Sequence, residues 1–135
     1  MGRDAENIIE LKHLTKTFSD GFTAVSDVNL EIKRGEFVTF LGPSGCGKTT
    51  TLRMIAGFDL PTGGEILLDG KNITNLPPNR RPINTVFQRY ALFPHMDVAA
   101  NISYGLRQKK MAKDLIARKV GKVLEVVDLE WFDNR

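Results

Sequence analysis

One run of eight residues carries the strongest chemical signal in this sequence. Residues 42–49 read Gly-Pro-Ser-Gly-Cys-Gly-Lys-Thr and fit the pattern G-x-x-x-x-G-K-[ST] of a phosphate-binding P-loop. Gly45 and Gly47 would let successive backbone N–H groups converge on a polyphosphate, and a helix after the loop would add its positive end. Lys48 is expected to reach the β- and γ-phosphates, and the Thr49 hydroxyl to bind Mg²⁺. The run therefore predicts a site for a nucleoside triphosphate and its magnesium ion.

The whole run and the residue after it are expected to surround the phosphates. The predicted nucleotide-binding residues of this segment are Gly42, Pro43, Ser44, Gly45, Cys46, Gly47, Lys48, Thr49 and Thr50. Cys46 occupies a free position of the pattern. Two interpretations stay open for it: a small residue that fits the loop, or a thiol made reactive by the helix N-terminus.

The segments on either side of the run are those that a P-loop requires. Residues 37–41 are nearly continuous apolar sequence, which predicts a strand of a parallel sheet that is buried on both faces. Residues 50–56 predict a helix that ends at Gly57. The order of strand, glycine loop and helix is the context in which this motif is credible.

Hydrophobic periodicity predicts the other elements. Strands are expected over residues 8–18, 25–32, 65–69 and 83–87, and helices over 98–106 and 112–127. The last helix carries an apolar stripe, and the proline-rich residues 75–82 are expected to form a loop. This mixture of strands and helices predicts an α/β fold.

The composition fits one globular domain of 135 residues, with 41% hydrophobic and 26% charged residues. No apolar run reaches the roughly 18 residues that a membrane helix needs, and the first residues lack the apolar stretch of a secretory signal. A cytoplasmic chain that can dock on a membrane protein is expected. Its single cysteine, Cys46, rules out an internal disulfide.

Basic residues are concentrated near the C-terminal end. Between residues 107 and 122 lie Arg107, Lys109, Lys110, Lys113, Arg118, Lys119 and Lys122, with one acid, Asp114. Two interpretations stay open: a solvated helix face, or a contact with lipid headgroups or an acidic partner. Aromatic residues do not interleave with this run, so a nucleic-acid partner is not expected.

Three segments together resemble a known family. The P-loop, the strand and turn at 64–70 (GEILLDG) and residues 86–96 (VFQRYALFPHM) are similar to the nucleotide-binding subunits of ABC transporters. Among these, the importer ATPases of the spermidine/putrescine type are the most similar, from about Ile9 to Phe132. The resemblance implies an ABC-type P-loop NTPase fold over residues 1–135, in which an antiparallel β subdomain joins a partial parallel core sheet with helices. It also implies ATP and Mg²⁺ as ligands.

The resemblance assigns three residues outside the P-loop. Phe18 corresponds to the aromatic residue of the A-loop, whose flat ring stacks on adenine. Val25 corresponds to a position near the ribose. Gln88 corresponds to the Q-loop glutamine, which binds Mg²⁺ and positions the attacking water; with Lys48 it makes up the implied catalytic pair.

The segment after Gln88, through His95 and Val98, corresponds to the surface that docks on the transmembrane permease subunits. The resemblance thus implies a homodimer on the inner face of the cell membrane that drives import, with polyamines as the expected cargo. Arg89 and the run 99–101 (Ala-Ala-Asn) depart from the residues that are common in this family.

Several motifs of the family do not occur in the printed sequence. These are the Leu-Ser-Gly-Gly-Gln signature, the Walker B carboxylates, the D-loop and the switch histidine. Phosphoryl transfer needs Mg²⁺ held on both sides and an oriented water. We therefore expect a truncated domain that binds nucleotide weakly or not at all and does not hydrolyse it. Residues 37–41 would then lack a neighbouring strand, which predicts an intertwined or swapped dimer.

Two alternative functions stay open. One is a nucleotide-binding or assembly fragment without catalysis, and the other is an importer ATPase for another small solute such as a sugar or iron. A small P-loop kinase is disfavoured, because such kinases place the loop near the N-terminus, whereas roughly forty residues precede it here.

Overall fold

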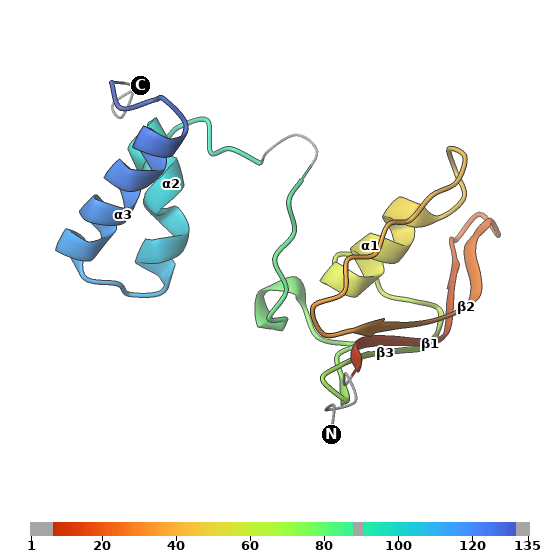
Figure 1. Ribbon diagram of the computed structural model, residues 1–135. Coiled ribbons are helices and arrows are strands. Elements are labelled where there is room, and N and C mark those ends of the chain that lie inside the picture. The colour runs from red at the N-terminus through yellow and green to blue at the C-terminus, as the bar shows by residue number, and fades with distance from the viewer. Residues whose placement is uncertain (1–6, 88–90, 132–135) are drawn as a thin grey trace. The chain divides into compact units, whose positions relative to one another are not determined.

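A computed structural model of the protein describes residues 7–87 and 91–131, and these fall into two compact units, Met1–Thr85 and Val86–Arg135 (Figure 1). In the described residues, the first unit contains β1 (Asn7–Thr17), β2 (Thr23–Lys33), α1 (Lys48–Ala56), β3 (Gly63–Leu68), β4 (Lys71–Asn72) and a 3₁₀ turn at Pro78–Arg80. The second contains α2 (Val98–Gln108) and α3 (Lys113–Val126). None of the described helices is long and apolar enough to cross a membrane.

The strands of the first unit form one antiparallel sheet in the order β2-β1-β3-β4. Leu11 of β1 lies opposite Leu30 of β2 and Ile66 of β3, so the central strand is paired on both sides. Its residues alternate between polar and apolar, which suits a sheet with one buried face. The antiparallel β subdomain that the family resemblance implies is confirmed.

A bulge in β1 lets this strand bury two residues that simple alternation would place on opposite faces. Leu11 and Leu14 are both buried although they are three positions apart. Between them His13 has a left-handed φ of 52°, and Asp27 on the neighbouring strand has a φ of 50°. The pairing register shifts at this point. An extra residue in each strand therefore returns the following side chains to the core.

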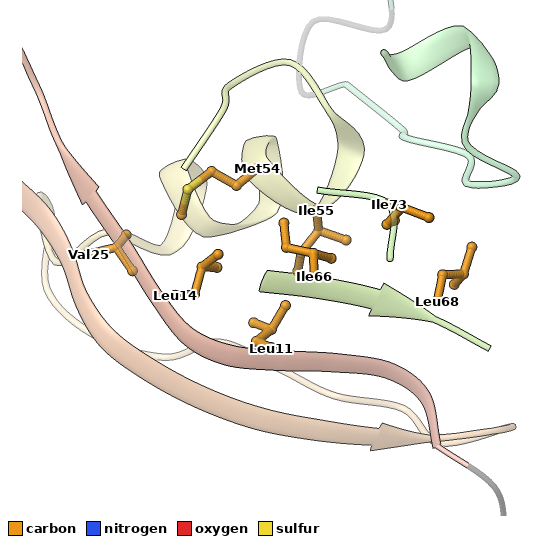
Figure 2. Close-up of a cluster of buried hydrophobic side chains, with 8 residues drawn as sticks. All are labelled: Leu11, Leu14, Val25, Met54, Ile55, Ile66, Leu68 and Ile73. Atoms are coloured by element: carbon orange, nitrogen blue, oxygen red, sulfur yellow. The ribbon is translucent and has the colours of Figure 1, made fainter. Parts of the chain in front are cut away.

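The core of the first unit lies between the sheet and α1 (Figure 2). Its buried side chains are Leu11, Leu14, Val25, Met54, Ile55, Ile66, Leu68 and Ile73. Met54 and Ile55 come from α1 and point toward the strands in Figure 2. Full burial of each such side chain contributes about 1.5–3 kcal/mol. This packing fixes α1, and with it the loop that precedes α1, on the antiparallel sheet.

Arg81 fixes the C-terminal end of α1. Its guanidinium donates to the carbonyl oxygens of Met54 (2.7 Å), Ile55 (2.8 Å), Leu76 (2.7 Å) and Thr74 (2.9 Å). The residue is only 5% exposed, and burial lowers the pKa of Arg81 from its ordinary value. A cation at this end also complements the negative end of the helix dipole. Arg81 thus ties the P-loop helix to the proline-rich segment.

The second unit is a pair of packed helices (Figure 1). Asp97 caps the N-terminus of α2, where its Oδ1 accepts a hydrogen bond from the Ala100 N–H at 2.6 Å. Ser103 of α2 and Val120 and Leu124 of α3 are buried. The stripe expected on the last helix is thus partly used to hold the pair together.

Most predicted elements are confirmed, with bounds that differ by a few residues, and so is the α/β fold class. The strands predicted at 37–41 and 83–87 are wrong: within the described part of the chain neither segment forms a strand or a parallel pair. Phe37 and Leu41 are 92% and 88% exposed rather than buried. An apolar run needs a neighbouring strand for its backbone hydrogen bonds, and the described residues provide none.

Candidate nucleotide-binding site

The P-loop joins an irregular segment to the N-terminus of α1. Three of its glycines have positive φ: 155° at Gly42, 83° at Gly45 and 87° at Gly47. No side chain caps the helix, and its first backbone bond runs from Thr51 N–H to Gly47 O at 2.8 Å. By helix geometry, the N–H groups of the first turn precede this bond and can donate to an anion. This arrangement fits a phosphate ligand.

Gly47 brings the loop into direct contact with β2. A Cβ on Gly47 would lie 2.3 Å from the Ala24 carbonyl oxygen and 3.1 Å from Val25 Cγ2. Val25 is 4% exposed and belongs to the core, as Figure 2 shows. The observed role of Val25 is therefore to support the loop from the sheet, while its contact with a ribose stays a prediction.

Lys48 lies along the loop. Its Nζ donates to the carbonyl oxygens of Gly42 at 2.7 Å and Pro43 at 2.8 Å, and lies 3.3 Å from Cys46 Sγ. The backbone carbonyls of the loop thus hold Lys48 in place, while its contact with phosphate oxygens stays a prediction. Cys46 is exposed, and a Cβ on Gly42 would meet its Sγ at 2.7 Å. The thiol therefore occupies the space beside Gly42, as a small fitting residue would.

The predicted magnesium ligands are described only in part. Thr49 is exposed at the start of α1, which leaves its hydroxyl accessible. Gln88 lies outside the described residues. Among residues 7–87 and 91–131, no group of three or more His, Cys, Asp or Glu side chains could hold a metal ion. Thr49 can supply one oxygen ligand, the type that Mg²⁺ prefers, when phosphate and water supply the others.

Sequence reasoning missed Thr51. Its hydroxyl donates to Gly47 O at 2.9 Å, alongside the backbone N–H of the same residue, and the side chain is buried. This bond holds the last loop residue to the first turn of the helix. A threonine four positions after the last glycine of the P-loop is the signal that could have revealed it.

The predicted adenine-stacking residue stands at the end of the first hairpin. Phe18 follows β1, and its backbone exchanges hydrogen bonds with Phe22 and Gly21. The residue is 40% exposed, so part of its ring can accept a stacked base. Lys16 Nζ lies over this ring, 5.4 Å from its centroid. Sequence reasoning missed Lys16, although its position two residues before an aromatic residue places both on one face of a strand.

Asn101 organises the segment that was predicted to dock on permease subunits. Its Oδ1 accepts from Phe93 N–H at 2.9 Å, and its Nδ2 donates to the carbonyls of Phe93, Met96 and Asp97. The Phe93 ring also stacks at 4.6 Å on Tyr104. Beside these rings lies a cavity of about 270 Å³. Asn101 thus fixes this loop, while Arg89 lies outside the described residues.

Comparisons with known proteins show the family to which this chain belongs. A family model described as ABC transporter matches residues 25–135. The spermidine/putrescine import ATP-binding protein PotA of Clostridium novyi (strain NT) is 55% identical over 131 residues, which are 97% of this chain and 38% of that protein. The protein of the same name from Nitrosomonas eutropha is 56% identical over 128 residues, with 95% and 35% covered. The chain therefore spans a little over one third of the length of these relatives.

Solved structures show the same fold. The dimeric structure of MJ0796, a bacterial ABC transporter cassette, matches with a TM-score of 0.81 at 35% identity. The match covers 94% of this chain and 60% of the MJ0796 chain. The structure of cbiO1 from Clostridium perfringens, part of the ABC transporter complex cbiONQ, has a TM-score of 0.76 at 31% identity, with 96% and 54% covered. A post-hydrolysis state of MJ0796 bound to ADP and Pi scores 0.75. With its P-loop at the start of α1 and a family match over residues 25–135, this chain belongs to the ABC transporter family.

Proposed function

We propose that this chain is the P-loop-bearing part of an ATP-binding, energy-coupling subunit of an ABC import system. The observation that carries the proposal is the geometry of the P-loop. Its helix begins without a side-chain cap, and Lys48 already lies against the loop. A polyphosphate can therefore receive backbone N–H groups, a helix N-terminus and an ammonium group at one place.

The proposed ligand is ATP with Mg²⁺, which supplies a transferable γ-phosphoryl group when bound. In this proposal the loop N–H groups hold the phosphates, and Lys48 exchanges its carbonyl partners for β- and γ-phosphate oxygens. Thr49 supplies an oxygen to Mg²⁺, and Gln88 supplies a second ligand and orients water. Phe18 stacks on the base, and Val25 lies beneath the loop near the ribose.

The proposed cargo is a polyamine, and the proposed partners are permease subunits. The support for the cargo is the identity of about 55% with proteins named for spermidine/putrescine import. The support for the partners is the loop at 91–98, which Asn101 holds in a defined shape beside exposed apolar side chains. This docking would place the chain on the cytoplasmic face of the cell membrane. A sugar or iron importer would use the same site, so the cargo is the less specific part of the proposal.

The 135 residues by themselves are proposed to bind nucleotide weakly and not to turn it over. The signature, Walker B and switch motifs do not occur among them, so these residues lack a carboxylate to orient water and a second clamp on the γ-phosphate. A nucleotide-binding or assembly role without catalysis is the second candidate, and the same argument favours it for this polypeptide alone.

Titration of the purified chain with Mg·ATP, followed by NMR of its backbone amides, tests nucleotide binding. We expect shifts around the P-loop, with a dissociation constant of about 0.1–1 mM. Lys48→Ala should abolish these shifts, whereas Lys12→Ala, at an exposed position in the middle of β1, should not change them. A wild-type chain that shows no shifts at millimolar ATP contradicts the proposal. Phosphate release above background, abolished by Lys48→Ala, contradicts the expected lack of hydrolysis.

A chimeric subunit tests the import system. The described residues would replace the matching part of the Clostridium novyi relative, and spermidine uptake would be measured in cells that lack their own polyamine ATPase. We expect uptake that depends on Lys48 of the inserted segment. A chimera that is expressed and assembles with the permease but supports no uptake contradicts the polyamine assignment.

A further inference from the structure

Lys16 is held between Phe18 and the segment that follows the P-loop helix. Its Nζ donates to the Leu60 carbonyl oxygen at 2.6 Å and lies 5.4 Å from the centroid of the Phe18 ring. The first distance is that of a strong hydrogen bond and the second is within the range of a cation–π contact. A lysine ammonium has three N–H donors. Because the bond to Leu60 uses one of them, the other two and the positive charge remain available to the Phe18 ring.

The segment that holds Lys16 is itself anchored to α1. Arg53 in the last turn of α1 donates to both carboxylate oxygens of Asp59, at 2.6 and 3.1 Å, and Asp59 precedes Leu60 in the chain. This bidentate pair fixes the course of the backbone after the helix. The pKa of Asp59 is lowered, mainly by the hydrogen bond from Arg53, with a smaller contribution from the charge of Lys16. A negative charge is therefore maintained near the lysine.

The sheet also places Lys16 next to the P-loop. Lys16 of β1 is paired with Val25 of β2, and Val25 Cγ2 lies 3.1 Å from the position of a Cβ on Gly47. One strand pair thus separates the lysine from the phosphate loop. Lys16 contacts the aromatic residue, the segment that follows the P-loop helix and the strand that supports the loop.

We propose that Lys16 is a positioning residue for the nucleobase. It covers one face of the Phe18 ring, leaves the other face for a purine, and ties the ring to the P-loop helix through Leu60. This role rests on the proposed function, because it requires a nucleotide whose phosphates bind the P-loop. A cation on one ring face is attracted by the electron-rich π system and limits rotation of the ring. The ring is therefore set at a fixed distance from the phosphates before the base arrives.

The test compares a ligand that has a base with one that has none. Binding of Mg·ATP and of inorganic tripolyphosphate to the 135-residue chain would be measured by NMR titration. Lys16→Met keeps the aliphatic stem but removes the charge and the donor, and we expect it to weaken ATP about three- to fivefold. Tripolyphosphate should bind unchanged. Lys16→Arg, which keeps a cation and a donor, should restore ATP binding to within about twofold of wild type.

Two further variants make the result specific. Phe18→Leu should weaken ATP by itself, and Lys16→Met should add nothing in that background, because the lysine acts through the ring. Lys12→Met is the matched control on the same strand, since Lys12 pairs with Glu10 and contacts neither group. It should bind both ligands as wild type does.

Other outcomes overturn the inference. Equal losses for ATP and tripolyphosphate would mean that Lys16 acts on the loop or on folding, and an unchanged ATP affinity would mean that it has no role. If Lys16→Met does not fold, Lys16→Arg and Phe18→Leu still test the proposal. A Lys16→Arg variant that binds ATP as weakly as Phe18→Leu contradicts the role of the cation. A wild-type chain that binds tripolyphosphate but gains nothing from the base overturns this inference alone. A chain that binds neither ligand overturns the proposed function and this inference with it.

Discussion

Gly57 and Arg81 are in direct contact at the end of the P-loop helix. A Cβ on Gly57 would lie 2.6 Å from Arg81 Nε, and the glycine has a φ of 86°. The absence of a side chain at Gly57 lets the guanidinium reach the carbonyls that end α1. The glycine that terminates the helix is therefore also the one that admits a buried cation.

Removal of the Arg81 guanidinium should destabilise the first unit. Arg81→Ala removes the guanidinium donor from four backbone carbonyls, of which Met54 O keeps the Gly57 N–H, and we expect the free energy of unfolding to fall by about 3 kcal/mol. Arg81→Lys should lose about half as much, because an ammonium cannot reproduce the planar fork. Urea unfolding followed by circular dichroism measures both values. A loss below about 0.5 kcal/mol for Arg81→Ala would show that water replaces the guanidinium easily.

Substitution of Gly57 should cost more than substitution of a comparable glycine in open space. Gly21 has nearly the same φ, 85°, and a Cβ there would meet nothing within 4 Å. We expect Gly21→Ala to lower the free energy of unfolding by about 1 kcal/mol, through backbone strain alone. Gly57→Ala adds the clash with Arg81 and should lower it by about 2–3 kcal/mol. In the Arg81→Ala background, Gly57→Ala should lower the free energy of unfolding by an amount closer to that of Gly21→Ala. If Gly57→Ala costs as much as it does in the wild type, its methyl group clashes with a residue other than Arg81.

Periodicity predicted the strands β1, β2 and β3 and the helices α2 and α3, because each of them exposes one face and buries the other. It could not predict the bulge at His13, since the register of Leu11 and Leu14 depends on the partner strand. The apolar run at 37–41 was misread for a related reason. Hydrophobicity measures what a segment gains from burial and says nothing about whether a neighbouring strand is present.

The features of the candidate site also differ in whether the sequence could predict them. The P-loop was predictable, because its spacing and its glycines encode a local backbone shape. Arg81 and Lys16 were not, since their contacts with Met54 and Leu60 join segments that are 27 and 44 residues apart. Only the packed structure brings Arg81 to the end of α1 and Lys16 to the segment that follows it.

The two inner glycines of the P-loop should differ in what their substitution affects. A Cβ on Gly47 would overlap the Ala24 carbonyl at 2.3 Å, whereas a Cβ on Gly45 would meet nothing within 4 Å. Gly47→Ala should therefore lower the free energy of unfolding by about 2–3 kcal/mol. Gly45→Ala should cost about 1 kcal/mol but should weaken ATP, because its methyl group enters the loop. Similar unfolding free energies for the two variants would contradict the observed close contact of Gly47 with β2.

Acid should remove the contribution of the Arg53–Asp59 pair. The hydrogen bond from Arg53 lowers the pKa of Asp59 in the folded chain, so near pH 4 the unfolded chain binds more protons and stability rises with pH. The contribution is fully present above the ordinary aspartate pKa and is lost as the pH falls through the lowered one. At pH 6 we expect Asp59→Asn to reduce the free energy of unfolding by about 0.5–1 kcal/mol, and the difference should vanish in stronger acid.

Asp114→Asn is the control for that series. Its partner Arg118 lies four residues on along α3 at 3.1 Å, and both side chains are about three-quarters exposed. An exposed pair of this kind contributes little, so Asp114→Asn should leave stability unchanged at both pH values. A difference between wild type and Asp59→Asn that grows as the pH falls would contradict the assigned sign.

Self-association through residues 37–41 is the last expectation. Phe37 and Leu41 are almost fully exposed, and in the described part of the chain no strand pairs with their segment. An apolar segment with unpaired backbone groups is a template for a second chain. At about 0.1–1 mM we expect light scattering to show a dimer, intertwined or swapped through this segment.

The double variant Phe37→Ser with Leu41→Ser should shift this equilibrium toward the monomer. Phe22→Ser removes an exposed aromatic from the hairpin turn instead and should leave the dimer intact. A wild-type chain that stays monomeric over this range would show that the exposed segment does not pair.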